Sequence, residues 1–166
     1  MSVWQSESGL PQNNVNSIAQ TPDGYLWLAT AEGLARFDGV KFTVFVSEKV
    51  PALRHSTITS LFVDRQGSLW IGTDGGGVAI LKENAFSSPL GLARLAGERI
   101  RALCEDAQGS LWIGTFERGL YRYDGQKVTK VPVGSERIRK AVPAGPGVWV
   151  ATEDAGLSYV EGATTV

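Results

Sequence analysis

The only histidine of the chain, His55, carries the one imidazole that could act as a general base. A carboxylate could assist such a base, and Glu98 and Glu136 stand in polar segments further along the chain. Ser56 follows His55 directly, but adjacency in sequence is not a signature of a catalytic triad, which is recognised by geometry. The sequence therefore allows an acid–base enzyme, a lyase or a hydrolase, that uses His55 with Glu98 or Glu136.

Other residues that could do chemistry have simpler interpretations. One cysteine and one histidine exclude an internal disulfide and a multi-cysteine or histidine-rich metal site, so we expect no metal and no other cofactor. Cys104 occupies a position that is apolar in the other repeat units described below, which favours a buried thiol over a nucleophile. Asp74-Gly75-Gly76-Gly77 resembles a calcium or phosphate loop in composition, but a glycine cluster at a hairpin tip is a weak sign of either.

The composition is that of an ordinary soluble protein. The 166 residues are 43% hydrophobic and 20% charged with a net charge of −1, which argues against a nucleic-acid partner. No apolar run approaches the roughly 18 residues of a membrane span, so we expect no membrane contact by this segment. The length predicts one domain, residues 1–166.

A repeated phrase must position any functional residues. Gly-Ser-Leu-Trp-Ile-Gly-Thr occurs at Gly67–Thr73 and at Gly109–Thr115, with variants at Gly24–Thr30 and Gly147–Thr152. The tryptophans, Trp27, Trp70, Trp112 and Trp149, are 43, 42 and 37 residues apart. Periods of about 40–45 are typical of four-stranded propeller blades. Four equal active sites in so short a chain would be unusual, so we interpret these tryptophans as blade core.

Each unit contains short strands between turn residues. The first strands are expected at Val15–Gln20, Ile58–Val63, Ile100–Glu105 and Ile138–Val142, and the tryptophan phrase is the second strand. Turns such as those at Asp64 and Asp106 need aspartate, glycine or proline, which explains these carboxylates better than acid catalysis does. We therefore expect an all-β propeller of about four four-stranded antiparallel blades, with approximate bounds 15–46, 58–88, 100–132 and 138–166.

The second strand favours a propeller over a sheet with one wet face. It is apolar at nearly every residue, as in a strand covered on both sides. Two residues after the tryptophan stands a small residue, namely Ala29, Gly72, Gly114 or Ala151. We expect this position to leave room for side chains of the adjacent blade.

Three forms of the assembly are open: a closed four-blade monomer, a larger self-associated ring, and an open fragment, which we expect least because its exposed apolar faces would tend to aggregate. Residues 3–6 look like a fourth strand without a blade and could complete the last blade. The chain would then close as a four-blade monomer, or two chains would form a larger ring of about eight blades. We expect self-association ahead of the closed monomer, because a tight four-blade ring strains flat blades.

The combined pattern resembles the two-component regulator propeller repeats. The resembling residues are GLPQNNVNSIAQTPDGYLWLATAEGLARFDGVKFTVF at Gly9–Phe45, followed by ITSLFVDRQGSLWIGTDGGGVAIL and IRALCEDAQGSLWIGTFERGLYRYDG. The fourth unit departs from the pattern, since Ala144 replaces the turn aspartate and its phrase is one residue shorter.

The resemblance implies a non-catalytic, ligand-sensing module of a bacterial hybrid histidine kinase or diguanylate cyclase. Its location would be periplasmic or otherwise extracytoplasmic, and the kinase or cyclase domain would lie downstream on a longer parent chain. Family members usually carry more repeats, so this chain is expected to be a fragment or a short relative. The start of the chain shows no signal-peptide pattern.

In a blade of four antiparallel strands, the loop between the second and third strands lies at one end of the blade. The connections to the neighbouring blades lie at the same end. These loops differ between units, and loops on a rigid scaffold often carry binding residues. A small polar ligand, for example a saccharide, is expected there. The candidate residues are Asn13, Asn14, Arg54, His55, Arg99, Phe116, Arg118, Arg137 and Glu153. The alternatives are the enzyme described above and a passive interaction scaffold.

Overall fold

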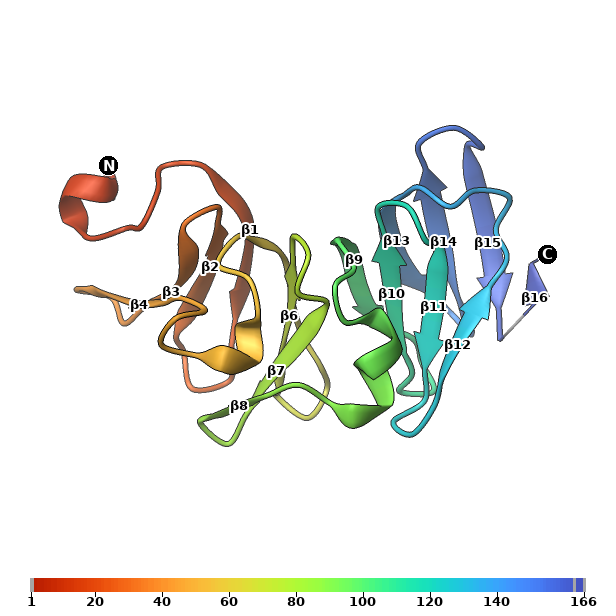
Figure 1. The fold of residues 1–166 in the computed structure, drawn as a ribbon, viewed down its shortest axis with the longest axis horizontal. Helices are drawn as coiled ribbons and strands as arrows, with labels where there is room; N and C mark the ends of the chain where they lie inside the picture. Colours follow the sequence, from red (N-terminus) through yellow and green to blue (C-terminus); the bar gives the residue numbers. More distant parts are fainter. Residues whose placement is uncertain (1, 163, 166) are drawn as a thin grey trace.

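The computed structural model describes residues 2–162 and 164–165, and these residues form four separate antiparallel sheets of four strands each (Figure 1). Within each sheet the strands are neighbours in chain order. The sheets comprise β1 Val15–Gln20, β2 Leu26–Thr30, β3 Gly33–Phe37 and β4 Phe42–Phe45; β5 Ile58–Val63, β6 Leu69–Thr73, β7 Val78–Lys82 and β8 Ala85–Ser87; β9 Ile100–Glu105, β10 Leu111–Thr115, β11 Leu120–Tyr123 and β12 Val128–Val131; and β13 Ile138–Ala144, β14 Gly147–Thr152, β15 Leu157–Glu161 and β16 Thr164–Thr165. The predicted all-β fold with four four-stranded antiparallel sheets is confirmed.

Three short 3-10 helices lie outside the sheets: η1 Ser6–Ser8, η2 Pro51–Leu53 and η3 Leu90–Leu95. The sequence did not reveal them, because each is too short to carry a helical period. Pro51 begins η2 and Pro89 precedes η3, which fits the fixed φ of proline at helix starts. Both helices bury leucines against the sheets, so they close the edges of the core.

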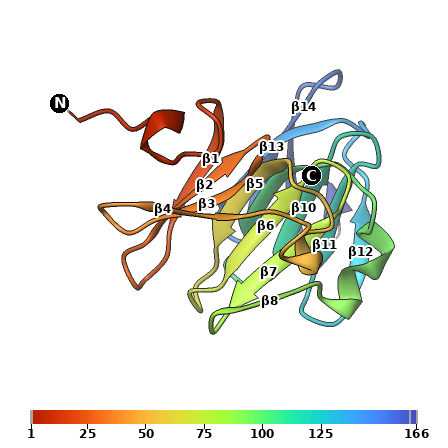
Figure 2. The ribbon, with the colours of Figure 1, turned by 60° about the vertical axis from the view of Figure 1, so that its left-hand side comes forward.

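The sheets follow one another as layers in an open arc (Figures 1 and 2). Three hydrophobic clusters lie between successive sheets and contain Trp27, Trp70 and Trp112 respectively. The first strands β1, β5, β9 and β13 contact one another in sequence along the inner side of the arc. Because the first and last sheets lie at opposite ends of the arc, the described residues do not form the closed monomer (Figure 1).

The amino-terminal segment differs from the expectation. Residues 3–6 do not complete the last blade, where β15 pairs instead with Thr164–Thr165 of β16. Trp4 packs edge to face on Phe37 of the first sheet, with 5.2 Å between ring centroids. An aromatic contact and the turn of η1 thus hold this segment on the first sheet. Residues 163 and 166 of the expected last blade lie outside the described residues.

The small residues beside the indoles serve the packing between sheets. A Cβ atom on Gly72 would lie 2.7 Å from Ile100 Cγ2, and one on Gly114 would lie 2.5 Å from Ile138 Cγ2. Such separations are far below van der Waals contact, so glycine lets the next sheet approach. The expected role of this position is confirmed for these two sheets.

The turn aspartates also have a structural role. The indole Nε1–H of Trp70 donates to Asp64 Oδ2 (2.9 Å), and that of Trp112 donates to Asp106 Oδ2 (2.8 Å). In the first unit Thr21 Oγ1 takes the same place and accepts from Trp27 (3.0 Å). Because a buried indole N–H needs an acceptor, these side chains fix the tryptophans, as the structural interpretation required.

Candidate ligand-binding site

The two predicted sets of loops meet at one end of the sheets. The Gly77 N–H, in the β6–β7 loop, donates to the Glu98 carbonyl just before β9 (3.0 Å). The Gly119 N–H, in the β10–β11 loop, donates in the same way to the Glu136 carbonyl before β13 (2.8 Å). Each loop is therefore tied to the entry of the next sheet, which makes this end a continuous surface.

A β-bulge recurs at this end of every first strand. In β1, β5, β9 and β13 the pairing register shifts by one residue just after the first residue of the strand. The residues left without a cross-strand partner are Asn16, Thr59, Arg101 and Arg139. A bulge redirects a side chain that would otherwise alternate with the ladder, and bulges are common beside binding sites. All four bulge residues are polar.

The bulge residues line one hollow of about 440 Å³ on the inner side of the arc. It is lined by Asn16, Ala31, Thr57, Thr59, Asp74, Arg99, Arg101 and Arg139. Residues of all four sheets or their connections thus contribute to one concave surface, and its size is in the range of small-molecule sites.

Two guanidinium groups at this hollow share one aromatic ring. The Cζ atoms of Arg99 and Arg101 lie 4.4 and 4.5 Å from the centroid of the Phe116 ring. Arg99 Nε donates to Asp74 Oδ1 (2.6 Å), and this hydrogen bond raises the pKa of Arg99, which stays charged. Cation–π contact and ion pairing together hold the cationic groups in place at the rim.

Of the three arginines that line the hollow, Arg101 has the fewest hydrogen-bond and ion-pair partners. Within the described part of the chain its Nε is buried and has no hydrogen-bond partner. The neighbouring Arg139 pairs with Glu153 across 3.0 Å. An unsatisfied buried donor costs free energy unless another group, such as a water molecule, completes it.

The structure gathers only part of the predicted site at the hollow. Arg99 lines it, Phe116 supports its arginines, and Glu153 pairs with its Arg139. His55 is adjacent, since its Nδ1 accepts from the backbone N–H of Thr57, which lines the hollow.

The other predicted residues lie elsewhere. Asn13 Oδ1 accepts from the Ser6 N–H (2.7 Å) and so holds the amino-terminal segment, while Asn14 is exposed. Arg118 lies 3.6 Å from Glu98. Arg137 lines a different hollow, of about 520 Å³, near the last sheet.

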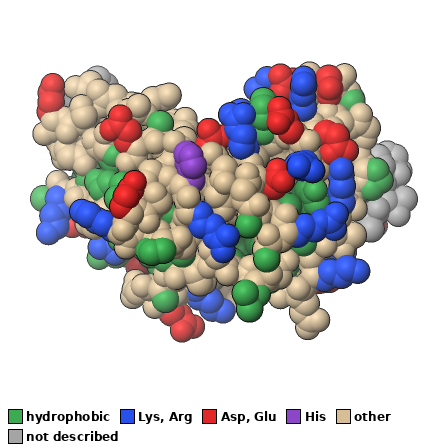
Figure 3. Space-filling model, viewed as in Figure 1, with side chains coloured by type: hydrophobic (Ala, Val, Ile, Leu, Met, Phe, Trp, Pro, Cys, Tyr) green, Lys and Arg blue, Asp and Glu red, His purple; other side chains and the backbone are tan. Residues whose placement is uncertain are grey.

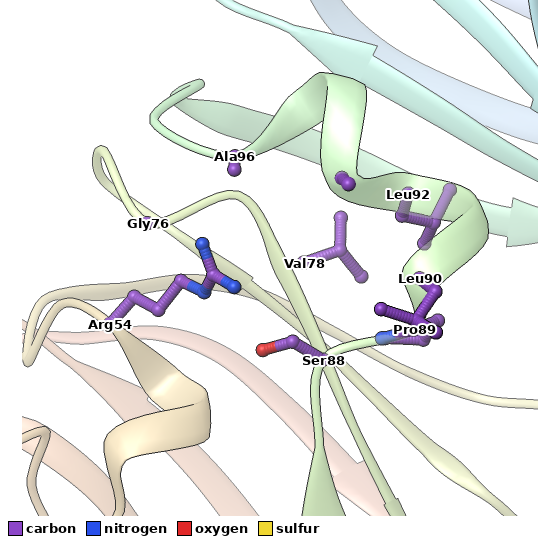
Figure 4. A pocket seen from close by; sticks show the side chains of 9 residues that line it. Arg54, Gly76, Val78, Ser88, Pro89, Leu90, Leu92 and Ala96 are labelled. Carbon is purple, nitrogen blue, oxygen red and sulfur yellow. The ribbon is translucent and has the colours of Figure 1, made fainter.

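Arg54 lines a cavity of its own beside η3. Figure 4 shows its side chain extending toward Val78, with Ser88 below the two and Pro89 next to Leu90. The cavity measures about 40 Å³. Since one water molecule occupies roughly 30 Å³ in the liquid, this space suits a water and not a saccharide.

The enzyme alternative needs His55 together with an available carboxylate. In the structure Glu98 lies beside Arg118 and Glu136 Oε2 lies 2.7 Å from Lys130 Nζ, so each carboxylate is already opposite a cation. Cys104 is buried in the third sheet, and burial raises the pKa of its thiol to about 12. A thiol in that state is a poor nucleophile, which confirms the prediction of a core residue.

The glycine cluster at residues 74–77 is explained by packing. A Cβ atom on Gly76 would lie 2.8 Å from the Leu53 carbonyl oxygen, and Gly77 adopts a φ of +76°.

Among the described residues, no group of three or more His, Cys, Asp and Glu side chains is arranged to hold a metal ion. In the same residues no helix is long and apolar enough to cross a membrane.

Sequence reasoning missed the bulge residues Asn16, Thr59, Arg101 and Arg139. A signal was present, because each directly follows the first β-branched residue of its strand and each is polar. Strict alternation, however, does not say toward which side a bulged residue points.

Charged side chains of both signs are interspersed over the face of the molecule that Figure 3 shows. The three arginines of the hollow, Arg99, Arg101 and Arg139, are therefore a local cluster and not part of a larger basic surface on that face.

The family of two component regulator propellers matches the chain at residues 9–32, 52–75 and 94–117. Among solved structures, the extracellular domain of the hybrid two component system BT3049 from B. thetaiotaomicron is similar, with 26% identity and a TM-score of 0.76 over 96% of this chain and 23% of that chain. The extracellular domain of the hybrid two component system BT4673 from the same organism has 23% identity and a TM-score of 0.77 over 94% and 22% of the two chains.

Virginiamycin B lyase from Staphylococcus aureus has 11% identity and a TM-score of 0.61 over 89% and 55% of the two chains, a likeness of fold alone. No curated protein matches the chain significantly. This chain spans less than a quarter of the two bacterial extracellular domains. Three of its four units match the family model, so these three units are two component regulator propeller repeats.

Proposed function

We propose that this chain is a ligand-sensing propeller module of a bacterial signalling protein, located outside the cytoplasm and not itself catalytic. The hollow that collects the four bulge residues carries the proposal, because it places three arginines beside amide and hydroxyl groups. The similarity to extracellular domains of two component systems supports a sensor region. A kinase or cyclase domain on a longer parent chain would receive the signal.

The chemistry of the hollow favours a small polar ligand with a carboxylate, such as an acidic saccharide. Guanidinium groups bind carboxylates through paired, charge-assisted hydrogen bonds. Arg101 is the central group, since it forms no ion pair with the described residues, whereas Arg99 and Arg139 are held by Asp74 and Glu153. Asn16 and Thr59 offer groups that could bind sugar hydroxyls.

The hollow also suits a signalling role, because its residues belong to different sheets. Arg101 lies on β9, Arg139 on β13 and Thr59 on β5. A ligand that bridges these side chains would favour one relative placement of neighbouring sheets. Such a ligand transmits a signal only if its affinity differs between two placements.

Thermal unfolding of the 166-residue chain in the presence of oligogalacturonate and of neutral cello-oligosaccharides tests the proposal. We expect oligogalacturonate to raise the melting temperature, because a ligand bound only by the folded state stabilises it. The neutral sugars should give little shift. Arg101→Gln should abolish the rise, since the guanidinium is removed while the bulge is kept.

Arg118→Gln is the matched control, because Arg118 lies at the same end of the sheets outside the hollow. It should retain the full shift. An equal shift in the Arg101→Gln and wild-type chains, or no shift with the acidic sugar, would reject a carboxylate site in this hollow.

A further inference from the structure

Another hollow, of about 490 Å³, lies on the outer side of the arc between the first and second sheets. The first sheet contributes β2, β3, β4 and the β1–β2 turn to it, and the second sheet contributes β7, β8 and the turn between them. This outer hollow shares no residue with the hollow around Arg101, which lies on the inner side. Its size is also in the range of small-molecule sites.

Aromatic rings form much of the surface of the outer hollow. Trp27, Phe45 and Phe86 follow one another across the two sheets. The ring centroids of Trp27 and Phe45 are 5.6 Å apart, and those of Phe45 and Phe86 are 5.2 Å apart. Trp27 is buried, whereas Phe45 and Phe86 are only half-buried where they line the hollow. Partly exposed rings offer apolar area on which a flat ligand can pack.

The cation that lines the outer hollow, Arg36, lies among these rings. Its Cζ atom is 4.5 Å from the ring centroid of Tyr25, 5.8 Å from that of Trp27 and 5.9 Å from that of Phe45. Within the part of the chain that the structure describes, the guanidinium forms no ion pair and donates no hydrogen bond. A guanidinium that lies over a ring still has N–H groups in its own plane, and these can donate to a ligand.

The third sheet shows what Arg36 lacks. Arg122 occupies the same register position there, directly opposite the tryptophan of the second strand. Its Nε lies 3.5 Å from Oδ2 of the turn carboxylate Asp106. In the first sheet Thr21 takes the place of that aspartate as the acceptor of the indole. Arg36 therefore stands where an arginine is paired in the third sheet, but without the carboxylate that pairs it.

The carboxylate that lines the outer hollow, Asp23, does not replace this partner. Asp23 Oδ1 accepts from the hydroxyl of Thr21 (2.5 Å) and from the backbone N–H of Tyr25 (3.4 Å). Both hydrogen bonds belong to the β1–β2 turn, and Asp23 forms no ion pair with the described residues. An anion that entered the hollow would supply the partner that Arg36 lacks.

We propose that the outer hollow binds a small aromatic carboxylate. The carboxylate accepts paired, charge-assisted hydrogen bonds from Arg36, because the two planar groups match in shape. The aromatic ring of the ligand packs on Phe45 and Phe86 and shields this ion pair from water. An exposed ion pair alone is worth little, so both parts of the ligand are needed. The inference does not rest on the proposed function, since it concerns a different hollow.

Nuclear magnetic resonance of the ¹⁵N-labelled 166-residue chain, titrated with indole-3-acetate, tests the proposal. The indole N–H signal of Trp27 reports on the outer hollow, because Trp27 lines it. We expect this signal to shift progressively until the site is saturated, while the signal of Trp112 stays in place. Indole-3-acetamide has the same ring without the charge. It should bind about tenfold more weakly, as expected when a charge-assisted hydrogen bond is lost.

Substitutions locate the binding site. Arg36→Gln should weaken the binding of indole-3-acetate about tenfold, because the charged donor is removed. Arg122→Gln is the matched control, since it makes the same change at the same register position of the third sheet, and it should bind as the wild type does. Arg101→Gln should also bind as the wild type does, because Arg101 lines the inner hollow. Wild-type positions of the Trp70 indole signal verify the fold of each variant.

Three results would overturn the proposal. The first is a Trp27 signal that does not shift with indole-3-acetate. The second is equal affinity for the acetamide, or wild-type affinity in Arg36→Gln, which would leave Arg36 as a packing residue over the rings. The third is loss of the Trp27 shift in Arg101→Gln, which would assign the ligand to the inner hollow. None of these results bears on the oligogalacturonate experiment, which has its own variants.

Discussion

Replacing Gly114 by valine is expected to destabilise the fold by about 3 kcal/mol, the upper end of the usual cost of overpacking. A Cβ atom at this position would lie 2.5 Å from Ile138 Cγ2 and 2.9 Å from Ile138 Cβ. Ala102 Cβ would lie 3.1 Å away on the neighbouring strand. The clash is with a β-branched side chain that is itself buried, so no flexible group can move aside. Urea unfolding followed by circular dichroism measures the loss.

The matched control is Ala151→Val, which changes the same register position in the last sheet. The described residues leave the side of that sheet that carries Trp149 uncovered, since Trp149 is 45% exposed, so the added methyl groups have room. The control should change stability by less than about 0.5 kcal/mol, as surface substitutions usually do. Equal losses at the two positions would mean that the sheets do not pack as described.

Asp106→Ala should cost about 3 kcal/mol of unfolding free energy, because hydrogen bonds to a buried charged group are among the stronger ones and their loss leaves donors unpaired. Asp106 is 2% exposed and its Oδ2 accepts from Trp112 Nε1 at 2.8 Å. Its Oδ1 accepts from the N–H groups of Gln108 (3.0 Å) and Ser110 (2.9 Å). One carboxylate therefore fixes both the turn and the indole.

Asp106→Asn is the conservative control for this prediction. Its amide oxygen can still accept one set of these hydrogen bonds, so we expect a smaller loss than with alanine. Urea midpoints of the wild-type chain and both variants give the order directly. A urea midpoint of Asp106→Ala equal to that of the wild-type chain would show that the turn carboxylate does not anchor the tryptophan.

The repeated phrase was sufficient to predict the sheets from the sequence. The bounds of β1, β5 and β9 agree with the expected first strands, because β-branched residues and turn residues delimit them without ambiguity. The Gly72 and Gly114 positions were likewise predictable. A small residue repeated beside an indole has few explanations other than close packing.

The hollow was less accessible to sequence reasoning. Arg99 and Phe116 were predicted because they stand in variable loops, but Arg101 and Arg139 lie within strands. Their orientation depends on a bulge, which is a property of pairing between strands, so a polar residue after the first β-branched one does not by itself give the direction of its side chain. The sequence period therefore predicted the strands and sheets, but it did not predict that the bulges turn Arg101 and Arg139 toward the hollow.

The fourth unit shows how a local change follows its environment. Ala144 stands where Asp64 and Asp106 accept from an indole in the second and third units. Trp149 is also the exposed tryptophan of the four repeated ones. An indole that is partly in solvent can donate to water, so the anchoring carboxylate is dispensable here. The degenerate turn is thus consistent with the position of this unit at the end of the arc.

Hydrogen exchange of the five indole N–H groups, followed by nuclear magnetic resonance, tests most directly whether separate sheets are stacked face to face with a tryptophan fixed between each pair. The account predicts slow exchange for Trp27, Trp70 and Trp112, whose indoles are buried and donate to Thr21, Asp64 and Asp106. Trp4, which is 47% exposed, should exchange at once. Immediate exchange of any one of the three interior indoles would contradict the stacked arrangement.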